Sequence, residues 1–284
     1  KTPKYPVPVR FNMEGKSCVE FPYNLPSSFE PGTQNRAQLL ELAQNAERAE
    51  RFNDIINIMK CLVAVVDSDD DLTTEERNLL CLGYRRVINA QRTAWQAVKG
   101  QIIFEQENDA EAGTNYAALL VDYKDQIVEE MKRACDSGLD VFENVLLQKF
   151  KSSSALTSKV VYLKTAGDYH RYKAEIGDPH AGKVAADYYK RALDMAENEA
   201  KLPTTHPYLL DVVLNYSVCL KEILRDTNQA YILAKSTFDQ AIKKLEEIDD
   251  ASYQDTTLYL QLIRDNLTLW NPPSSHSSRS KGHH

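Results

Sequence analysis

Two pairs of basic residues stand seven positions apart in segments whose apolar residues recur every three or four positions. Arg85 and Arg92 form the first pair, and Lys164 and Arg171 form the second. Seven residues of an α-helix turn through about 700°, so the members of a pair project from one face, about 10 Å apart. Such a face can bind an anion, although basic residues at helical spacing are more often simply solvated. The spacing leaves both interpretations open.

A third pair and a run of four-residue steps carry carboxylate, amide and apolar side chains. Asn215 and Glu222 are again seven positions apart, and Leu258, Leu262 and Asn266 follow one another at intervals of four. An amide side chain can both donate to and accept from an extended peptide backbone. Leucines at this spacing are also typical of an ordinary helical core face. Spacing alone does not show whether these faces converge.

The elements that must position these residues are helices. Six of the eleven prolines lie in the first 35 residues and two follow Trp270, so residues 36–270 contain only three, together with seven glycines. A segment so poor in helix breakers is typical of an all-α fold. We predict nine helices, over residues 36–49, 52–66, 74–106, 114–149, 156–176, 181–201, 207–226, 228–246 and 252–270.

The helix breakers also divide the chain into three parts. We predict a Pro-rich arm over 1–35, a helical body over 36–270 and a Ser-rich tail over 271–284, whose final Gly-His-His is typical of a tag remnant. The net charge is −7; the arm carries +1 and the tail +2, which leaves −10 on the body. Because an acidic surface repels nucleic acid and anionic lipid, we expect neither as a partner.

Motifs of enzymes and of metal or cofactor sites are weak or missing. The sequence contains no GxSxG, GxxxxGK[ST] or HExxH pattern. Asp67, Asp69 and Asp71 match the first ligand positions of a calcium loop, but Leu72 and Asn78 stand where glycine and glutamate are required. We therefore expect no enzymatic activity, no metal site and no cofactor.

Apolar runs and cysteines bear on the compartment. The longest uninterrupted apolar run, Cys61–Val66, has six residues, whereas a membrane-spanning helix needs about 20. The five cysteines are scattered, and the N-terminal region has no apolar core before a cleavage site. We expect a cytoplasmic protein that can also be nuclear.

A weak internal repeat indicates one possible architecture. Residues 186–196 and 230–241 both resemble half of a tetratricopeptide helix pair. Stacked helix hairpins of this kind build a concave wall. One reading of the chain is therefore a scaffold that binds unphosphorylated peptide segments.

Longer motifs resemble the 14-3-3 proteins. They are Arg77–Leu80 with Tyr84, Tyr162–Lys164 followed by Gly167–Tyr169 and Arg171–Tyr172, Leu214–Asn215 with Ser217–Val218, and Gln261–Trp270. The resemblance covers about 36–270. It implies nine antiparallel helices, a concave amphipathic groove in each protomer of a dimer, and an extended peptide held through its phosphoserine or phosphothreonine. The protein would then be a non-enzymatic adaptor in signal transduction.

The resemblance also assigns roles to individual residues. The phosphate-binding residues are Arg85, Arg92, Arg171 and Tyr172, with arginine at 85 where the family usually has lysine. Two or more guanidinium forks and a phenol suit a tetrahedral dianion, and we expect these charges to face a wet groove. Peptide-backbone and support roles fall to Lys164, Asp168, Asn215, Glu222 and Asn266, where Asp168 would hold Arg171. The opposite, apolar wall is formed by Leu214, Val218, Leu258, Leu262, Leu269 and Trp270.

The resemblance further implies a homodimer through the first four helices. Gln126 would face Asp54 where a lysine is usual, so we expect a weaker dimer. The contact residues are Ala49, Arg51, Ala94, Val98, Tyr123 and Glu130. The 14-residue tail, fully extended, reaches about 45–50 Å, so a phosphorylated tail serine could enter the groove of its own or a neighbouring molecule.

Overall fold

Helices account for most of the residues that the structure, a computed structural model, describes. These residues are 12–13, 16–17, 32–67, 70–108, 116–149, 156–248 and 250–270. They belong to two compact units, Lys1–Ser158 and Lys159–His284. In the arm, β1 (Asn12–Met13) and β2 (Lys16–Ser17) pair antiparallel. The tail, and with it the predicted tail binding, lies outside the described residues.

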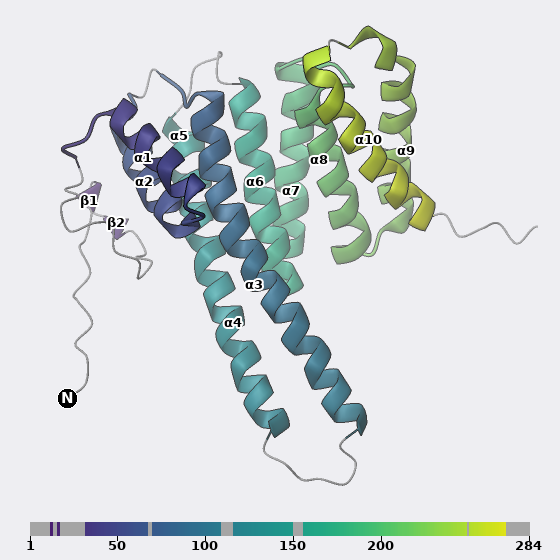
Figure 1. Ribbon diagram of the computed structural model, residues 1–284. Helices are drawn as coiled ribbons and strands as arrows, with labels where there is room; N and C mark the ends of the chain where they lie inside the picture. Colours follow the sequence, from purple (N-terminus) through teal and green to yellow (C-terminus); the bar gives the residue numbers. More distant parts are fainter. Residues whose placement is uncertain are drawn as a thin grey trace, which may run out of the picture. The chain divides into compact units, whose positions relative to one another are not determined.

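The first unit is built on a long antiparallel hairpin of α3 (Thr74–Asn108) and α4 (Tyr116–Leu139) (Figure 1). The second helix of the hairpin, α4, continues through the π-helical segment η1 (Asp140–Leu146) into α5 (Leu147–Lys149). Packed beside one end of the hairpin are α1 (Arg36–Arg48) and α2 (Phe52–Val65).

Apolar side chains from α2, α3 and α4 form the core of the first unit. Tyr84 is wholly buried, packs edge-on against Phe142 at a ring distance of 6.1 Å and donates to the Ser137 carbonyl at 3.0 Å. At the start of α3, Thr73 and Glu76 satisfy each other's backbone amides in a capping box. These contacts fix the direction of α3, which carries the predicted arginine pair.

The second unit contains most of α6 (Leu156–Glu175), followed by α7 (Ala181–Asp194) and its π-helical extension η3 (Met195–Glu199). Next come α8 (Pro207–Val218), which begins with proline in its first turn and continues as η4 (Cys219–Ile223), and α9 (Thr227–Lys243). A 3₁₀ turn, η5 (Leu245–Glu247), leads to α10 (Asp250–Trp270). Within this unit α8 packs against α7, α9 and α10.

The predicted helices agree closely with the observed ones. Counted as continuous helical segments, the described residues contain nine helices, and each end lies within three residues of its predicted position. The all-α prediction is confirmed. Nothing among these helices has the length and apolar character of a membrane span.

Candidate functional site

A network of charged and polar side chains lies in the second unit, on α6, α7 and α8. Lys164, Asp168, Arg171 and Glu175 follow one another along α6 at intervals of four, three and four, so they share one face of the helix. Asp168 is 8% exposed and Arg171 is 7% exposed. Buried charges at this level require partners, and the structure supplies them.

Lys164 is held between two carboxylates. Its Nζ lies 2.9 Å from Asp168 Oδ2 and 2.8 Å from Asp211 Oδ2, and only 16% of its side chain is exposed. Burial would lower the pKa of Lys164, but the two carboxylates outweigh burial and raise this pKa above its ordinary value. Lys164 therefore stays protonated near neutral pH and cannot serve as a general base.

Arg171 bonds through all three of its guanidinium nitrogens. Nε donates to the Tyr189 hydroxyl at 3.1 Å, one terminal nitrogen donates to Glu175 Oε1 at 2.9 Å, and the other donates to Asn215 Oδ1 at 3.3 Å. Asp168 Oδ1 lies 3.7 Å from the last of these nitrogens. Each terminal nitrogen carries a second N–H, which can be offered to an anion.

Tyr172 lies against the same guanidinium. The Cζ atom of Arg171 lies 4.7 Å from the centre of the Tyr172 ring, a cation–π distance, and the Tyr172 side chain is half-buried. The structure thus brings together two of the four residues predicted to bind phosphate. The ring of Tyr172 also limits the directions in which the Arg171 side chain can turn.

The charges of this network nearly cancel. Lys164 and Arg171 contribute two positive charges, and Asp168, Glu175 and Asp211 contribute three negative charges. A cluster with this balance does not by itself attract a dianion. Phosphate recognition therefore needs additional cations.

The predicted source of those cations is α3 of the first unit. Arg85 and Arg92 lie on this one helix as expected; Arg85 is exposed and Arg92 is half-buried. That they act together with Arg171 and Tyr172 stays a prediction.

The residues predicted to contact the peptide backbone differ in their surroundings. Asn215 donates to the carbonyl and the carboxylate of Asp211, at 2.9 and 2.8 Å, while its oxygen accepts from Arg171. Glu222 is exposed in η4, and its carboxylate lies 3.8 Å from Arg225. Asn266 is half-buried on α10. Of these three, only Asn215 joins the network around Arg171 in the described structure.

Three members of the network were missed from the sequence, and one of them, Asp211, lies on α8. Glu175 follows Arg171 by four residues, a spacing that does predict an ion pair. Tyr189 comes from α7, and only the packing of that helix reveals its part. The expectation of a wet groove is also wrong for Arg171, which is buried because Tyr189, Glu175 and Asn215 surround it.

Three of the leucines predicted to form the apolar wall lie on the outer side of α10 within the second unit. Leu258, Leu262 and Leu269 are 57%, 42% and 79% exposed. The opposite face of the helix is buried in this unit and carries Thr256, Leu260, Ile263 and Leu267. The three exposed leucines are therefore not core residues of their unit, which favours their assignment to a binding surface. The other members of the predicted wall, Leu214, Val218 and Trp270, are half-buried.

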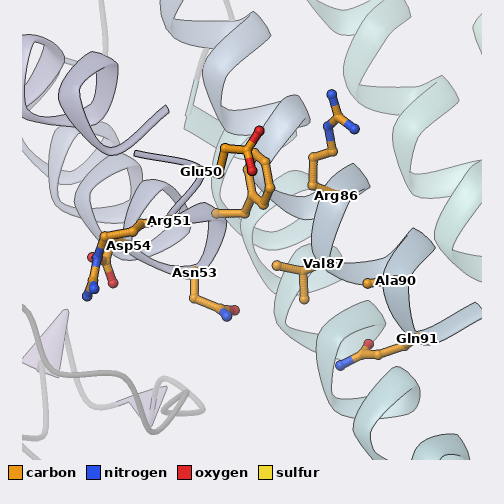
Figure 2. A pocket seen from close by; sticks show the side chains of 9 residues that line it. Glu50, Arg51, Asn53, Asp54, Arg86, Val87, Ala90 and Gln91 are labelled. Atoms are coloured by element: carbon orange, nitrogen blue, oxygen red, sulfur yellow. The ribbon is translucent and has the colours of Figure 1, made fainter. Parts of the chain in front are cut away.

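In the first unit, a recess of about 330 Å³ lies between the start of α2 and α3 (Figure 2). Asn53 and Gln91 extend into it from the two helices, and Arg51 and Arg86 stand at its border. The Oε1 atom of Gln91 is buried and accepts no hydrogen bond from the described residues. A buried acceptor in this state is costly unless a donor reaches it from elsewhere.

The predicted dimer residues lie at or near the surface of this unit. Ala49, Arg51, Tyr123 and Glu130 are exposed, and Ala94 and Val98 are half-buried. On α4, a second recess of about 500 Å³ is mainly acidic. It is lined by Asp122, Asp125, Gln126, Glu129, Glu130 and Arg133.

Comparison with known proteins assigns the chain to one family. The family model described as 14-3-3 protein matches residues 42–271. The 14-3-3-like protein GF14 chi of Arabidopsis thaliana is 40% identical over 245 residues, which cover 84% of this chain and 88% of the relative. The 14-3-3 protein homolog of Trichoderma harzianum is 42% identical over 233 residues, covering 81% and 85%. The chain belongs to the 14-3-3 family.

Proposed function

We propose that this chain is an adaptor that binds peptides containing phosphoserine or phosphothreonine and thereby regulates phosphorylated client proteins in signal transduction. Membership of the 14-3-3 family carries the proposal. The arrangement of Arg171 against Tyr172 supports it, because the pair presents a guanidinium and a phenol side by side. As an adaptor, the protein needs no cofactor and catalyses no reaction.

We assign phosphate binding to Arg171 and Tyr172 of the network and to Arg85 and Arg92 of α3. Arg85 and Arg92 supply the surplus positive charge that the nearly neutral network lacks. Arg171 offers its remaining terminal N–H groups, and Tyr172 offers its hydroxyl. Bidentate guanidinium contacts with a phosphate dianion are short and charge-assisted, so they outweigh the hydrogen bonds of the phosphate with water.

The remainder of the peptide is proposed to meet one polar and one apolar surface. Lys164, Asn215, Glu222 and Asn266 are the candidates for contacts with the peptide backbone. Exposed leucines on α10 are the candidates for the apolar side, since three of them stand out from their unit. An extended chain can present polar backbone groups and alternate side chains to such a pair of surfaces.

The adaptor role can be tested by capturing proteins from a cell lysate on the immobilised chain, with and without phosphatase treatment of the lysate. We expect phosphatase to remove most captured proteins. Arg85→Glu should cause the same loss, whereas the control Lys190→Glu, an exposed change on α7, should not. Capture that survives both phosphatase and Arg85→Glu would instead support a tetratricopeptide-like scaffold for unphosphorylated segments.

We also propose that the protein forms a homodimer through its first unit. The recess beside α2 has Arg51 and Arg86 at its border and an unsatisfied Gln91 acceptor, whereas the recess on α4 is mainly acidic. The lining of the α2 recess carries both signs of charge, Glu50 and Asp54 beside Arg51 and Arg86, so the contact we propose is Arg86 of one protomer with the carboxylates of its partner's α4 recess. A donor from the partner would also satisfy Gln91.

Light scattering at micromolar concentration tests this proposal. The expected mass is twice the monomer mass, and Glu130→Arg should lower it because the net charge of the acidic recess would change from −3 to −1. A monomer mass for the unmodified chain would refute the dimer while leaving peptide binding to be judged separately.

A further inference from the structure

Tyr189 stands at the centre of the network on α6, α7 and α8. Its ring is 0% exposed, and its hydroxyl donates to Asp168 Oδ1 at 2.6 Å. The hydroxyl oxygen of Tyr189 in turn accepts from Arg171 Nε at 3.1 Å. A phenol that donates to one group and accepts from another has a fixed hydroxyl direction, so its position constrains both neighbours.

The ring itself has little freedom to move. A Cβ atom on Gly167 would lie 2.9 Å from the ring, so α6 and Tyr189 approach as closely as glycine allows. On another side, Tyr216 stacks on the ring at 6.0 Å and 25°. The hydroxyl of Tyr189 is therefore delivered to Asp168 and Arg171 by a rigid support.

The bond to Nε has a particular effect on Arg171. Nε lies next to the side-chain stem, so a fixed acceptor there sets the plane of the guanidinium, and the two terminal nitrogens are left to point toward Glu175, Asn215 and any anion. Burial and the neighbouring carboxylate of Asp168 raise the pKa of Tyr189, which keeps the phenol protonated and able to donate.

We infer that Tyr189 is a positioning residue for phosphate recognition, whose hydroxyl sets the plane of the Arg171 guanidinium while its ring rests on Gly167. The residue does not touch the phosphate; it acts through Arg171. The inference rests on the proposed function, because it assigns a second layer of residues to the same phosphate site.

The test replaces Tyr189 by phenylalanine, which keeps the ring and its packing but removes the hydroxyl. We expect Tyr189→Phe to weaken binding of a phosphoserine peptide about tenfold, because a guanidinium without its fixed acceptor loses the orientation that bidentate phosphate contacts require. At saturation, the ³¹P chemical shift of the bound phosphoserine should move toward that of free peptide. The matched control, Tyr216→Phe, removes a hydroxyl from the stacked neighbour and should change neither quantity.

Thermal unfolding of each variant shows whether it is folded, so that weaker binding by a folded variant can be assigned to the position of Arg171. If Tyr189→Phe binds within twofold of the unmodified chain and its bound ³¹P shift is unchanged, the residue only packs and the inference is wrong. If the unmodified chain itself shows no phosphate-dependent binding, the proposed function fails and this inference with it.

A second variant covers the case in which Tyr189→Phe does not fold. Gly167→Ala should displace the ring and give the same weaker affinity and the same ³¹P change. Its control is Gly100→Ala on α3, where an added Cβ meets nothing within 4 Å. Unchanged peptide binding by folded Gly167→Ala would contradict the inference independently.

Discussion

Lys164 Nζ lies 2.8 Å from Asp211 Oδ2, so a largely buried ion pair joins α6 to α8 in the second unit. The same ammonium also contacts Asp168, and Asp211 in turn accepts from Asn215. Lys164 thereby links Asp168, a neighbour of Arg171, to α8, the helix that carries the predicted peptide contact Asn215. The charge of Lys164 therefore has a structural role in this unit.

Replacing Asp211 by asparagine should destabilise the protein by about 1–3 kcal/mol, because Lys164 would keep only one of its two carboxylates in a poorly solvated place. The matched control is Asp239→Asn, which breaks the exposed pair with Lys235, whose two side chains are 45% and 46% exposed. That change should cost less than about 0.5 kcal/mol. Denaturant titration of both variants checks the difference, and equal losses would contradict a special role for the Lys164 pair.

Arg171 and Arg85 should differ in what their removal does to stability. Arg171→Ala would leave Glu175 without its buried cation and Asp168 with Lys164 alone, so we expect a loss of about 2–4 kcal/mol together with loss of phosphopeptide binding. Arg85 is exposed, and Arg85→Ala should reduce binding while leaving stability within about 0.5 kcal/mol. Thermal unfolding measures the stability of the two variants, and peptide titration of the same samples measures their affinity. A large loss of stability in Arg85→Ala would show that this arginine is structural.

The first turn of α8 should make stability depend on pH. His206 caps this helix: its Nδ1 accepts from the Tyr208 amide at 3.1 Å, and burial lowers the pKa of His206. Because the pKa of His206 is lower in the folded chain than in the unfolded chain, its contribution to folding stability is complete above the unfolded pKa, about 6.5. It is lost as the pH falls from there through the folded pKa, since protonation takes place first in the unfolded chain.

The check is a comparison of melting temperatures at pH 7.5 and pH 5.5. His206→Asn keeps a side-chain acceptor at the cap but cannot titrate in this range. We expect the melting temperature of the unmodified chain to fall more on acidification than that of His206→Asn. An identical fall in both would mean that other groups account for the pH dependence.

Gly182 should tolerate no side chain. A Cβ there would lie 2.6 Å from the Cγ2 atom of Ile223, at the contact of α7 with η4. Gly182→Ala should therefore destabilise the protein by about 1–3 kcal/mol. Gly100→Ala, in open space within α3, should instead stabilise it by about 0.5–1 kcal/mol because alanine is the better helix former. Equal effects in calorimetric scans would show that the close α7–η4 approach is not maintained in solution.

The helices could be predicted from the sequence because their signals are local. Proline and glycine are rare within residues 36–270, and the apolar period is that of a helix throughout. The seven-residue step from Lys164 to Arg171 likewise placed both on one face of α6, as the structure shows. Positions on a single helix depend only on its geometry.

The partners of those residues could not be predicted in the same way. Tyr189 reaches Arg171 only because α7 packs on α6 at Gly167, and no spacing along the chain encodes that approach. The burial of Arg171 follows from the same packing. On α10, leucines at core-like spacing proved to be exposed, since periodicity gives the face of a helix but not what covers it.

Phosphate-dependent binding of a peptide can be measured by calorimetric titration. One phosphoserine peptide with an upstream arginine is compared with its unphosphorylated twin at the same pH and salt. We expect a dissociation constant of micromolar or lower for the phosphopeptide and a loss of roughly 3–5 kcal/mol of binding free energy, more than 100-fold in affinity, for the twin. Equal affinities for the two peptides would contradict phosphate-dependent binding.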